Sequence, residues 1–341
     1  MLKAPFKATL IAGALALSGL VSAAQTFEIE HLPLVKHAGN ITVSPDGDTT
    51  AYTLSNPRNM LEGDKDGTPD SHLYVMPSKG KNKNKAVRFI GSKGSVSSLQ
   101  FSTDNETLFF KTKREDDKNT ALYSISINGG EAKKRFEYET SIGDYAVSKD
   151  GKTLYFVARE KDKSKDLKKK GFKAYVYEEE KRLASLWMVA LDDEDAEAKK
   201  LFSQGHISNF ELSPKGDKIV LASAPTNLID DYYMQRDLHV IDLESGEVTA
   251  TVVIPGKLGK FEFSEDGKHI AILAGTDIND SAAGVLMVAD AKSGELRQLT
   301  KDAKQHIADI DWYKNDIMAV AHRGVESAVV LYEKDGDVKR T

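Results

Sequence analysis

The chain is marked by short runs in which apolar and polar residues alternate. One phrase recurs: an alternating run, a Ser, a turn of the Asp-Gly kind, and a second apolar run. Alternation with period two places every second side chain on one face of a β-strand. Asp-Gly supplies the positive φ that a tight hairpin requires. The phrase therefore predicts a β-hairpin, and its copies are ITVSPDGDTTAYTL (41–54), LQFSTDNETLFFKT (99–112), YAVSKDGKTLYFVA (145–158), FELSPKGDKIVLAS (210–223), FEFSEDGKHIAILA (261–274) and the degenerate IDWYKNDIMAVA (310–321).

A second phrase follows each copy of the first. It is a short strand, a Gly or Asp turn, and a closing basic-apolar strand, so it predicts two further strands per unit. The copies are HLYVMPSKGKNKNKAVRFI (72–90), ALYSISINGGEAKKRF (121–136), SLWMVALDDEDAEAKKLF (185–202), DLHVIDLESGEVTATV (237–252), VLMVADAKSGELRQLT (285–300) and VVLYEKDGDVKRT (329–341).

Repetition at this period decides the fold class. Units of about 50 residues with four strands each are typical of a β-propeller. A β-sandwich would not repeat its turn chemistry in register six times. We predict an all-β propeller of four-stranded blades, with repeats near 41–90, 99–136, 145–202, 210–252, 261–300 and 310–341. An incomplete, truncated ring is the alternative that six copies leave open.

Two steps between repeats are longer than the others and locate insertions. They are NPRNMLEGDKDGTPDS (56–71) and AREKDKSKDLKKKGFKAYVYEEEKRLAS (158–185). Insertions in a propeller fall in loops at one of its two faces, and such loops usually carry function. These two segments are where we look for a binding site.

The first 24 residues have the layout of a secretory signal. Lys3 and Lys7 precede an apolar Ala/Leu-rich run, and small residues follow that suit cleavage after Ala23 or Ala24. The run is too short to span a bilayer comfortably as an anchor. We expect a signal peptide at 1–24, a propeller domain at 25–341, and a periplasmic or secreted protein without a membrane anchor.

Charge and cysteine usage exclude some classes of function. The net charge is −5, and removal of the two signal lysines leaves −7. This acidity does not favour nucleic-acid binding, which needs a concentrated basic surface. The chain has no Cys, so it has neither disulfides nor thiolate chemistry.

No catalytic motif is found. The chain lacks a Gly-x-Ser-x-Gly nucleophile elbow. None of its eight histidines forms a His-x-His or His-x-x-x-His pair. His206 and His306 each precede Ile at equivalent repeat positions, which favours a structural role. We therefore expect no catalytic residue in this chain.

One loop has a weak calcium pattern. EGDKDGTPD (62–70) places Asp64, Asp66 and Asp70 around a Gly, but the spacing is not that of an EF-hand. A solvated hairpin tip is the interpretation we favour. We expect no metal and no cofactor.

Two segments carry a resemblance to a known family. FEIEHLPLVKHAGNITVSPDGDTTAYTLSNP (27–57) resembles the entry into the propeller of prolyl oligopeptidase family serine peptidases, in their bacterial acylaminoacyl-peptidase-like and dipeptidyl-peptidase-like branch. YVYEEEKRLASLWMVALDDEDAEAKKLF (175–202) is similar to the region of that branch in which a tyrosine-and-acid strand leads into an "LW-V-D" segment. The Ser-Pro-Asp-Gly repeats are also shared with TolB-like propellers.

The resemblance implies a function that this chain cannot perform alone. In that family the propeller caps a C-terminal α/β-hydrolase domain with a Ser, Asp and His triad, and filters peptide substrates by size. No such domain is present here, so the chain is expected to be a fragment of an exported peptidase that hydrolyses short peptides. A free-standing TolB-like protein-binding propeller is the alternative, and a lactonase-type propeller with a channel metal is a third.

The resemblance also implies a substrate-binding pair. In dipeptidyl peptidases a Tyr-Glu-Glu-type motif of the propeller binds the amino terminus of the substrate. VYEEE (176–180) would place Glu179 and Glu180 in that role, with Glu178 adjacent. Two carboxylates suit an ammonium group, because each can accept one of its hydrogen bonds.

Overall fold

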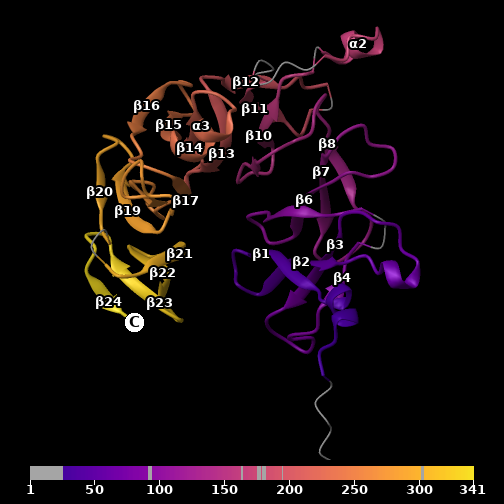
Figure 1. Cartoon of the computed structure of the whole chain (residues 1–341), viewed down its shortest axis with the longest axis horizontal. Helices are drawn as coiled ribbons and strands as arrows, with labels where there is room; N and C mark the ends of the chain where they lie inside the picture. The colour runs from indigo at the N-terminus through magenta and orange to yellow at the C-terminus, as the bar shows by residue number, and fades with distance from the viewer. Residues whose placement is uncertain are drawn as a thin grey trace, which may run out of the picture.

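The computed structural model describes residues 26–90, 94–162, 164–174, 178, 182–193, 195–300 and 303–341. They form six four-stranded antiparallel sheets arranged in a ring, which confirms the predicted all-β propeller (Figure 1). Helical segments are short and lie before the first sheet or in loops: η1 (Ile29–Leu34), η2 (Met60–Glu62), α2 (Ser164–Lys169) and α3 (Ile229–Met234).

Each sheet, or blade, consists of four consecutive strands in chain order, so no strand is exchanged between blades. Blades 1 to 3 contain β1 (His37–Val43), β2 (Thr49–Asn56), β3 (Asp70–Pro77), β4 (Val87–Arg88); β5 (Ser97–Phe101), β6 (Thr107–Thr112), β7 (Ala121–Ser126), β8 (Lys133–Phe136); and β9 (Tyr145–Val147), β10 (Thr153–Arg159), β11 (Ala184–Ala190), β12 (Lys199–Phe202). Blades 4 to 6 contain β13 (His206–Leu212), β14 (Lys218–Ala224), β15 (Asp237–Asp242), β16 (Val248–Val252); β17 (Leu258–Phe263), β18 (His269–Ala274), β19 (Val285–Asp290), β20 (Leu296–Gln298); and β21 (His306–Tyr313), β22 (Asp316–Arg323), β23 (Glu326–Glu333), β24 (Val338–Arg340).

The repeated Ser closes the first hairpin of five blades. Its hydroxyl accepts a hydrogen bond, 2.9–3.1 Å long, from the backbone N–H five residues later. In four of these blades it also donates to the Asp two residues on, and this bond is the main cause that lowers the pKa of Asp46, Asp104, Asp150 and Asp266. Blade 6 has Tyr313 in place of the Ser and turns more tightly, with Tyr313 paired to Asp316. The motif is therefore a turn that satisfies its own polar groups.

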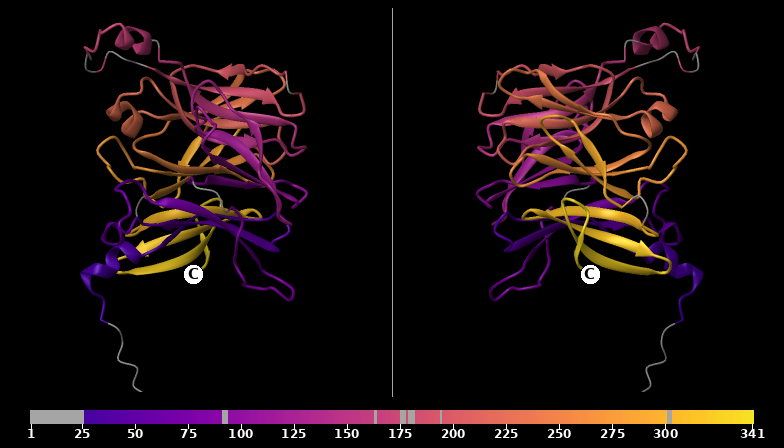
Figure 2. Two further views of the ribbon diagram at one scale, coloured as in Figure 1. Left: turned by 90° about the vertical axis from the view of Figure 1, so that its right-hand side faces the viewer. Right: turned by 90° about the vertical axis from the view of Figure 1, so that its left-hand side faces the viewer.

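The hairpin connections separate the two faces of the ring. The turns after the first and third strands of a blade lie on one face, and the connections after its second and fourth strands lie on the other. The longer connections 57–69, 160–183, 225–236 and 275–284 all follow a second strand. They share one face, which we call the loop face, and Figure 2 shows α2 and α3 projecting on the same side of the ring.

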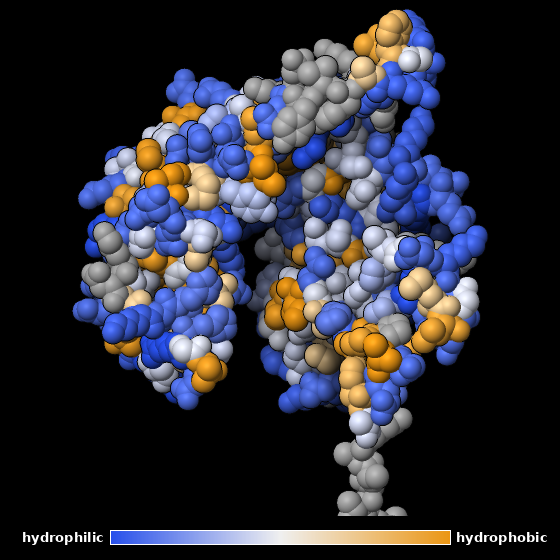
Figure 3. Space-filling model, viewed as in Figure 1, coloured by the Kyte–Doolittle hydropathy of each residue, from blue (hydrophilic) through white to orange (hydrophobic). Residues whose placement is uncertain are grey.

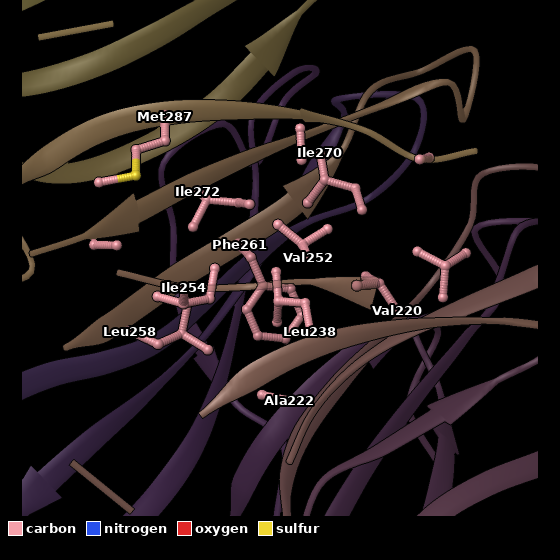
Figure 4. Close-up of a cluster of buried hydrophobic side chains, with 14 of the residues drawn as sticks. Val220, Ala222, Leu238, Val252, Ile254, Leu258, Phe261, Ile270, Ile272 and Met287 are labelled. Carbon is pink, nitrogen blue, oxygen red and sulfur yellow. The ribbon is translucent and has the colours of Figure 1, made fainter. Parts of the chain in front are cut away.

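The core lies between neighbouring blades rather than within any one of them. In the cluster drawn in Figure 4, Val220, Leu238 and Val252 of blade 4 meet Phe261 and Ile272 of blade 5. All five are buried. Because each blade has two apolar faces, it must be covered on both sides by other blades.

Hydrogen bonds also join the first strands of successive blades. At four junctions, a side chain in or directly before the first strand of one blade accepts a backbone N–H of the first strand of the next blade. The pairs are Asn40 with Ser98 (3.1 Å), Gln100 with Val147 (2.9 Å), Asp144 with Phe210 (3.1 Å) and Glu211 with Phe263 (2.9 Å). At the last junction Lys260 instead donates to the Ile310 carbonyl oxygen (2.6 Å).

The ring has a gap between blades 6 and 1. No hydrogen bond or ion pair joins these two blades within the described part of the chain, and Figure 3 shows a groove between them. Ile41 and Val43 are 66% and 54% exposed, whereas Ile310 and Trp312 at the same repeat positions of blade 6 are buried. Met318 and Val329 lie on the face of blade 6 that points away from blade 5, and both are exposed. The missing neighbour explains both exposures.

We expect Gly205→Ala to destabilise the fold much more than Gly216→Ala. Both glycines have φ near +74°, so each substitution should cost about 1 kcal/mol for the left-handed backbone. Only at Gly205 would a Cβ collide with the carbonyl oxygen of Ala224, which adds roughly 1–3 kcal/mol of overpacking. Urea unfolding of the two variants measures the difference. Equal losses would contradict the close packing at the start of blade 4.

Candidate functional site

A cavity of about 840 Å³ opens on the loop face between blades 3 and 4. Its walls come from the link between β8 and β9, from the base of the 160–183 insertion, from the start of β13, and from α3. Its volume falls within the range of about 300–1,000 Å³ of ligand pockets. The predicted importance of the charged insertion thus coincides with a concave surface.

The blade 3 wall of the cavity is cationic because of strand register. Arg159 pairs with Ala184 across β10 and β11, and the ladder continues through the bond of Glu160 N–H to the Leu183 oxygen (3.4 Å). Side chains alternate along both strands, so Arg159, Lys161 and Arg182 face one side. All three line the cavity, whereas Glu160 pairs with Lys200 (3.2 Å).

The carboxylates near this wall are already engaged. Glu139 lies 3.7 Å from the Lys161 Nζ. Asp162 accepts hydrogen bonds from the Ser164 hydroxyl and N–H, which lower its pKa. Arg159 and Arg182 form no close ion pair with a described residue, although the charge of Arg182 also helps to lower the pKa of Asp162. Two guanidinium groups are therefore available to a ligand.

The blade 4 wall offers a neutral donor and aromatic surface. The His206 Nδ1 accepts the Ala184 N–H (3.0 Å), and burial lowers the His206 pKa, so the neutral ring carries its proton on Nε2. Tyr232 and Tyr233 of α3 line the same cavity with their rings edge to face. This contact of His206 with blade 3 fits the structural role predicted from its repeat position.

A buried arginine lies behind the tyrosines. Arg236 is 8% exposed, and its guanidinium stacks on the Tyr232 ring at 4.6 Å. It donates to the Ser208 hydroxyl (3.3 Å) and to the Leu258 carbonyl oxygen, while its Nε has no partner among the described residues. Burial lowers the pKa of Arg236, and among the described residues Tyr232 and Tyr233, rather than a carboxylate, oppose this effect.

A second titratable cluster lies where blades 4, 5 and 6 meet. Burial, reinforced by the Glu262 carboxylate, raises the pKa of Glu211 to about 8. Burial likewise raises the pKa of Glu262 to about 7, although Lys260 opposes the rise from 3.6 Å. Lys260 also contacts Asp309 at 3.0 Å. These groups join blades, and the described residues contain no set of three or more His, Asp or Glu side chains able to hold a metal.

The site residues predicted from the sequence either do not line this cavity or are not among the described residues. Glu179 and Glu180 lie outside the described residues, and the adjacent Glu178 has a positive φ of 61°. Asp64 accepts the Asn59 N–H (2.8 Å), and Asp66 accepts the Gly67 N–H (2.8 Å). Asp70 lies 3.6 Å from an Arg58 nitrogen. Each acid therefore has its own local partner.

The repeat pattern indicated the insertion but not that its cations line a cavity. Arg159, Lys161 and Arg182 occur where the alternation of β10 and β11 runs into the insertion, in AREK and KRLAS. The alternation of period two, continued beyond the apolar run of each strand, is the pattern that could have placed these three side chains on one face. No sequence pattern indicated that α3 forms the opposite wall of the cavity. The distance between α3 and blade 3 depends on how the blades are arranged in the ring.

Comparisons with known proteins place the fold. No protein-family model matches the chain, and no curated protein matches it. Among solved structures, the acylaminoacyl peptidase of Pyrococcus horikoshii matches with a TM-score of 0.62 and 14% identity, over 91% of this chain and 47% of that one. The chain thus spans less than half the length of that peptidase.

Two other solved propellers, whose chains are closer in length to this one, are also similar. The β-propeller domain of the trilobed protease from Pyrococcus furiosus, described as having an open velcro topology, matches with a TM-score of 0.56 and 14% identity, over 89% of this chain and 84% of that one. TolB from Acinetobacter baumannii matches with a TM-score of 0.50 and 12% identity, over 90% and 78%. The chain has the fold of peptidase propeller domains and of TolB.

None of the helices among the described residues has the length and apolar character needed to cross a membrane. The proposed signal segment 1–24 lies outside the described residues.

Glu211→Gln should change how stability depends on pH. The folded-state pKa of Glu211, about 8, exceeds its usual 4.5. The free energy of unfolding therefore decreases as the pH rises from 4.5 through 8. Gln keeps an oxygen for the Phe263 N–H but cannot ionise. We expect the variant to be more stable than the wild type at pH 9, on the order of a few kcal/mol, and not at pH 4.5.

Urea unfolding at several pH values measures this effect. Glu244→Gln, in the exposed β15–β16 turn, is the control and should follow the wild-type curve. If the Glu211→Gln curve also ran parallel to the wild type, Glu211 would not be the group that titrates.

Proposed function

We propose that this chain is the substrate-gating propeller portion of an exported serine peptidase that hydrolyses short peptides. The catalytic Ser, His and Asp would belong to an α/β-hydrolase domain outside these residues, attacking the peptide by acyl transfer. The observation that carries the proposal is the cavity on the loop face of a propeller whose fold matches 91% of the chain to an acylaminoacyl peptidase.

The arrangement suits admission of short, extended peptides. The longer connections lie on one face of the propeller, and the cavity opens on that face. A cavity of about 840 Å³ accommodates a few residues rather than a folded chain. A propeller of this kind therefore selects by size before any chemistry takes place.

One observation favours a free-standing binding propeller instead. The fold is also that of TolB, and Ile41, Val43 and Val329 are exposed on the faces that border the gap between blades 1 and 6. In that case the exposed apolar groups of blades 1 and 6 would belong to a protein interface.

The native protein from the cell envelope distinguishes the two functions. We expect an intact mass well above 37.5 kDa, a Gly-x-Ser-x-Gly sequence encoded after Thr341, and labelling by a fluorophosphonate. The amino terminus should follow Ala23 or Ala24 if the protein is exported. A soluble mature product that ends at Thr341 and does not react with the probe would overturn the peptidase proposal.

The two glutamates implied by the family resemblance give a separate prediction. In the complete enzyme, Glu179→Gln and Glu180→Gln should each raise KM roughly tenfold for peptides with a free amino terminus, because a charge-assisted hydrogen bond is lost. The same peptides with an acetylated amino terminus provide the matched control and should show no change. If neither substitution changed KM for either set of peptides, the role of Glu179 and Glu180 in binding the amino terminus would be contradicted.

A further inference from the structure

We infer that the cavity between blades 3 and 4 binds the carboxylate of a short peptide, with Arg159 and Arg182 as its ligands. This deepens the proposed function and rests on it for the peptide nature of the ligand. The recognition of a carboxylate rests on the charges and packing of the cavity alone.

The first reason is an excess of positive charge on one wall. Three cations, Arg159, Lys161 and Arg182, line the cavity against two carboxylates, which leaves one net positive charge among the described lining residues. Lys161 pairs with Glu139, and Arg182 attracts Asp162 without a close ion pair. The chain as a whole has a net charge of −5, so this local excess is contrary to its composition. A guanidinium group binds a planar carboxylate through two parallel hydrogen bonds, which makes Arg the suitable residue here.

The second reason is the buried charge of Arg236. Its side chain contacts Tyr232 and Ser208, both of which line the cavity. Its partners among the described residues are all neutral, although a buried charge is normally balanced by an opposite one. An anion in the cavity would supply that balance across a low-dielectric wall, where charges interact more strongly than in water.

The third reason concerns the rest of the ligand. Ile229, Tyr232 and Tyr233 form an exposed apolar and aromatic rim opposite the arginines, with Ile229 68% exposed. Such a rim suits an apolar side chain next to the carboxylate. The neutral His206 lies between the two walls and can donate from Nε2 to a carboxylate oxygen. A small inorganic anion would leave the aromatic rim unused.

The test compares three peptides that differ in whether they carry a carboxylate and in where it lies. They are Ala-Ala-Phe, its carboxamide, and Asp-Ala-Phe carboxamide, titrated into the full chain by calorimetry. We expect at least one carboxylate-bearing peptide to bind roughly tenfold more tightly than Ala-Ala-Phe carboxamide. Preference for the free acid assigns the carboxyl terminus as the source, and preference for the Asp peptide assigns an acidic side chain.

The variants are Arg159→Gln and Arg182→Gln, each of which removes one charge near the surface. Each should weaken the preferred peptide roughly tenfold and leave the affinity for Ala-Ala-Phe carboxamide unchanged. Arg135→Gln is the matched control, because it makes the same change on the exposed outer strand β8 and should bind like the wild type. Thermal unfolding of all three variants verifies that they are folded.

The inference is overturned if the three peptides bind alike, if none binds at millimolar concentration, or if both arginine variants bind like the wild type. These results are distinguishable from failure of the proposed function. The titration involves no reaction, whereas the peptidase proposal depends on the mass, the encoded nucleophile motif and the labelling of the native protein.

Discussion

Packing of each blade's first strand against the preceding blade is the constraint on which the structure depends. Single sheets of four short strands cannot bury both of their apolar faces, so stability comes from the five junctions between blades. Side-chain oxygens of Asn40, Gln100, Asp144 and Glu211 accept hydrogen bonds from N–H groups that the inner edge of each sheet leaves unpaired. The same arrangement explains why Ile41 and Val43, with no preceding blade, are exposed.

The ring also determines where binding chemistry can arise. Connections after the second strand of each blade lie on one face, so insertions there face one another without disturbing the blades. The cavity combines a cationic wall from blade 3 with an aromatic wall from blade 4. Arg236 lies at the junction of blades 4 and 5, where its charge is buried by the same packing that holds the ring together.

Burial of acidic groups between blades costs folding free energy, and the packing of the blades offsets this cost. Glu211 and Glu262 have raised pKa values because burial disfavours their ionised forms. The carboxyl of Glu211 still accepts the Phe263 N–H, so the junction between blades 4 and 5 is coupled to its protonation state. Lys260 binds across the next junction, which places both charge signs in the wall where the last three blades meet.

The sequence by itself determined the blade: alternation, the Ser and Asp-Gly turns and their sixfold repetition predict hairpins that close within a few residues. It also located the charged insertion, because a break in a regular period is visible in one dimension. Only the tertiary structure decided that Arg159 and Arg182 share a cavity with Tyr232, and that Arg236 is buried among neutral partners within the described part of the chain. The reason is physical: local turns and strand periods depend on neighbouring residues, whereas a cavity wall depends on how separate blades stack.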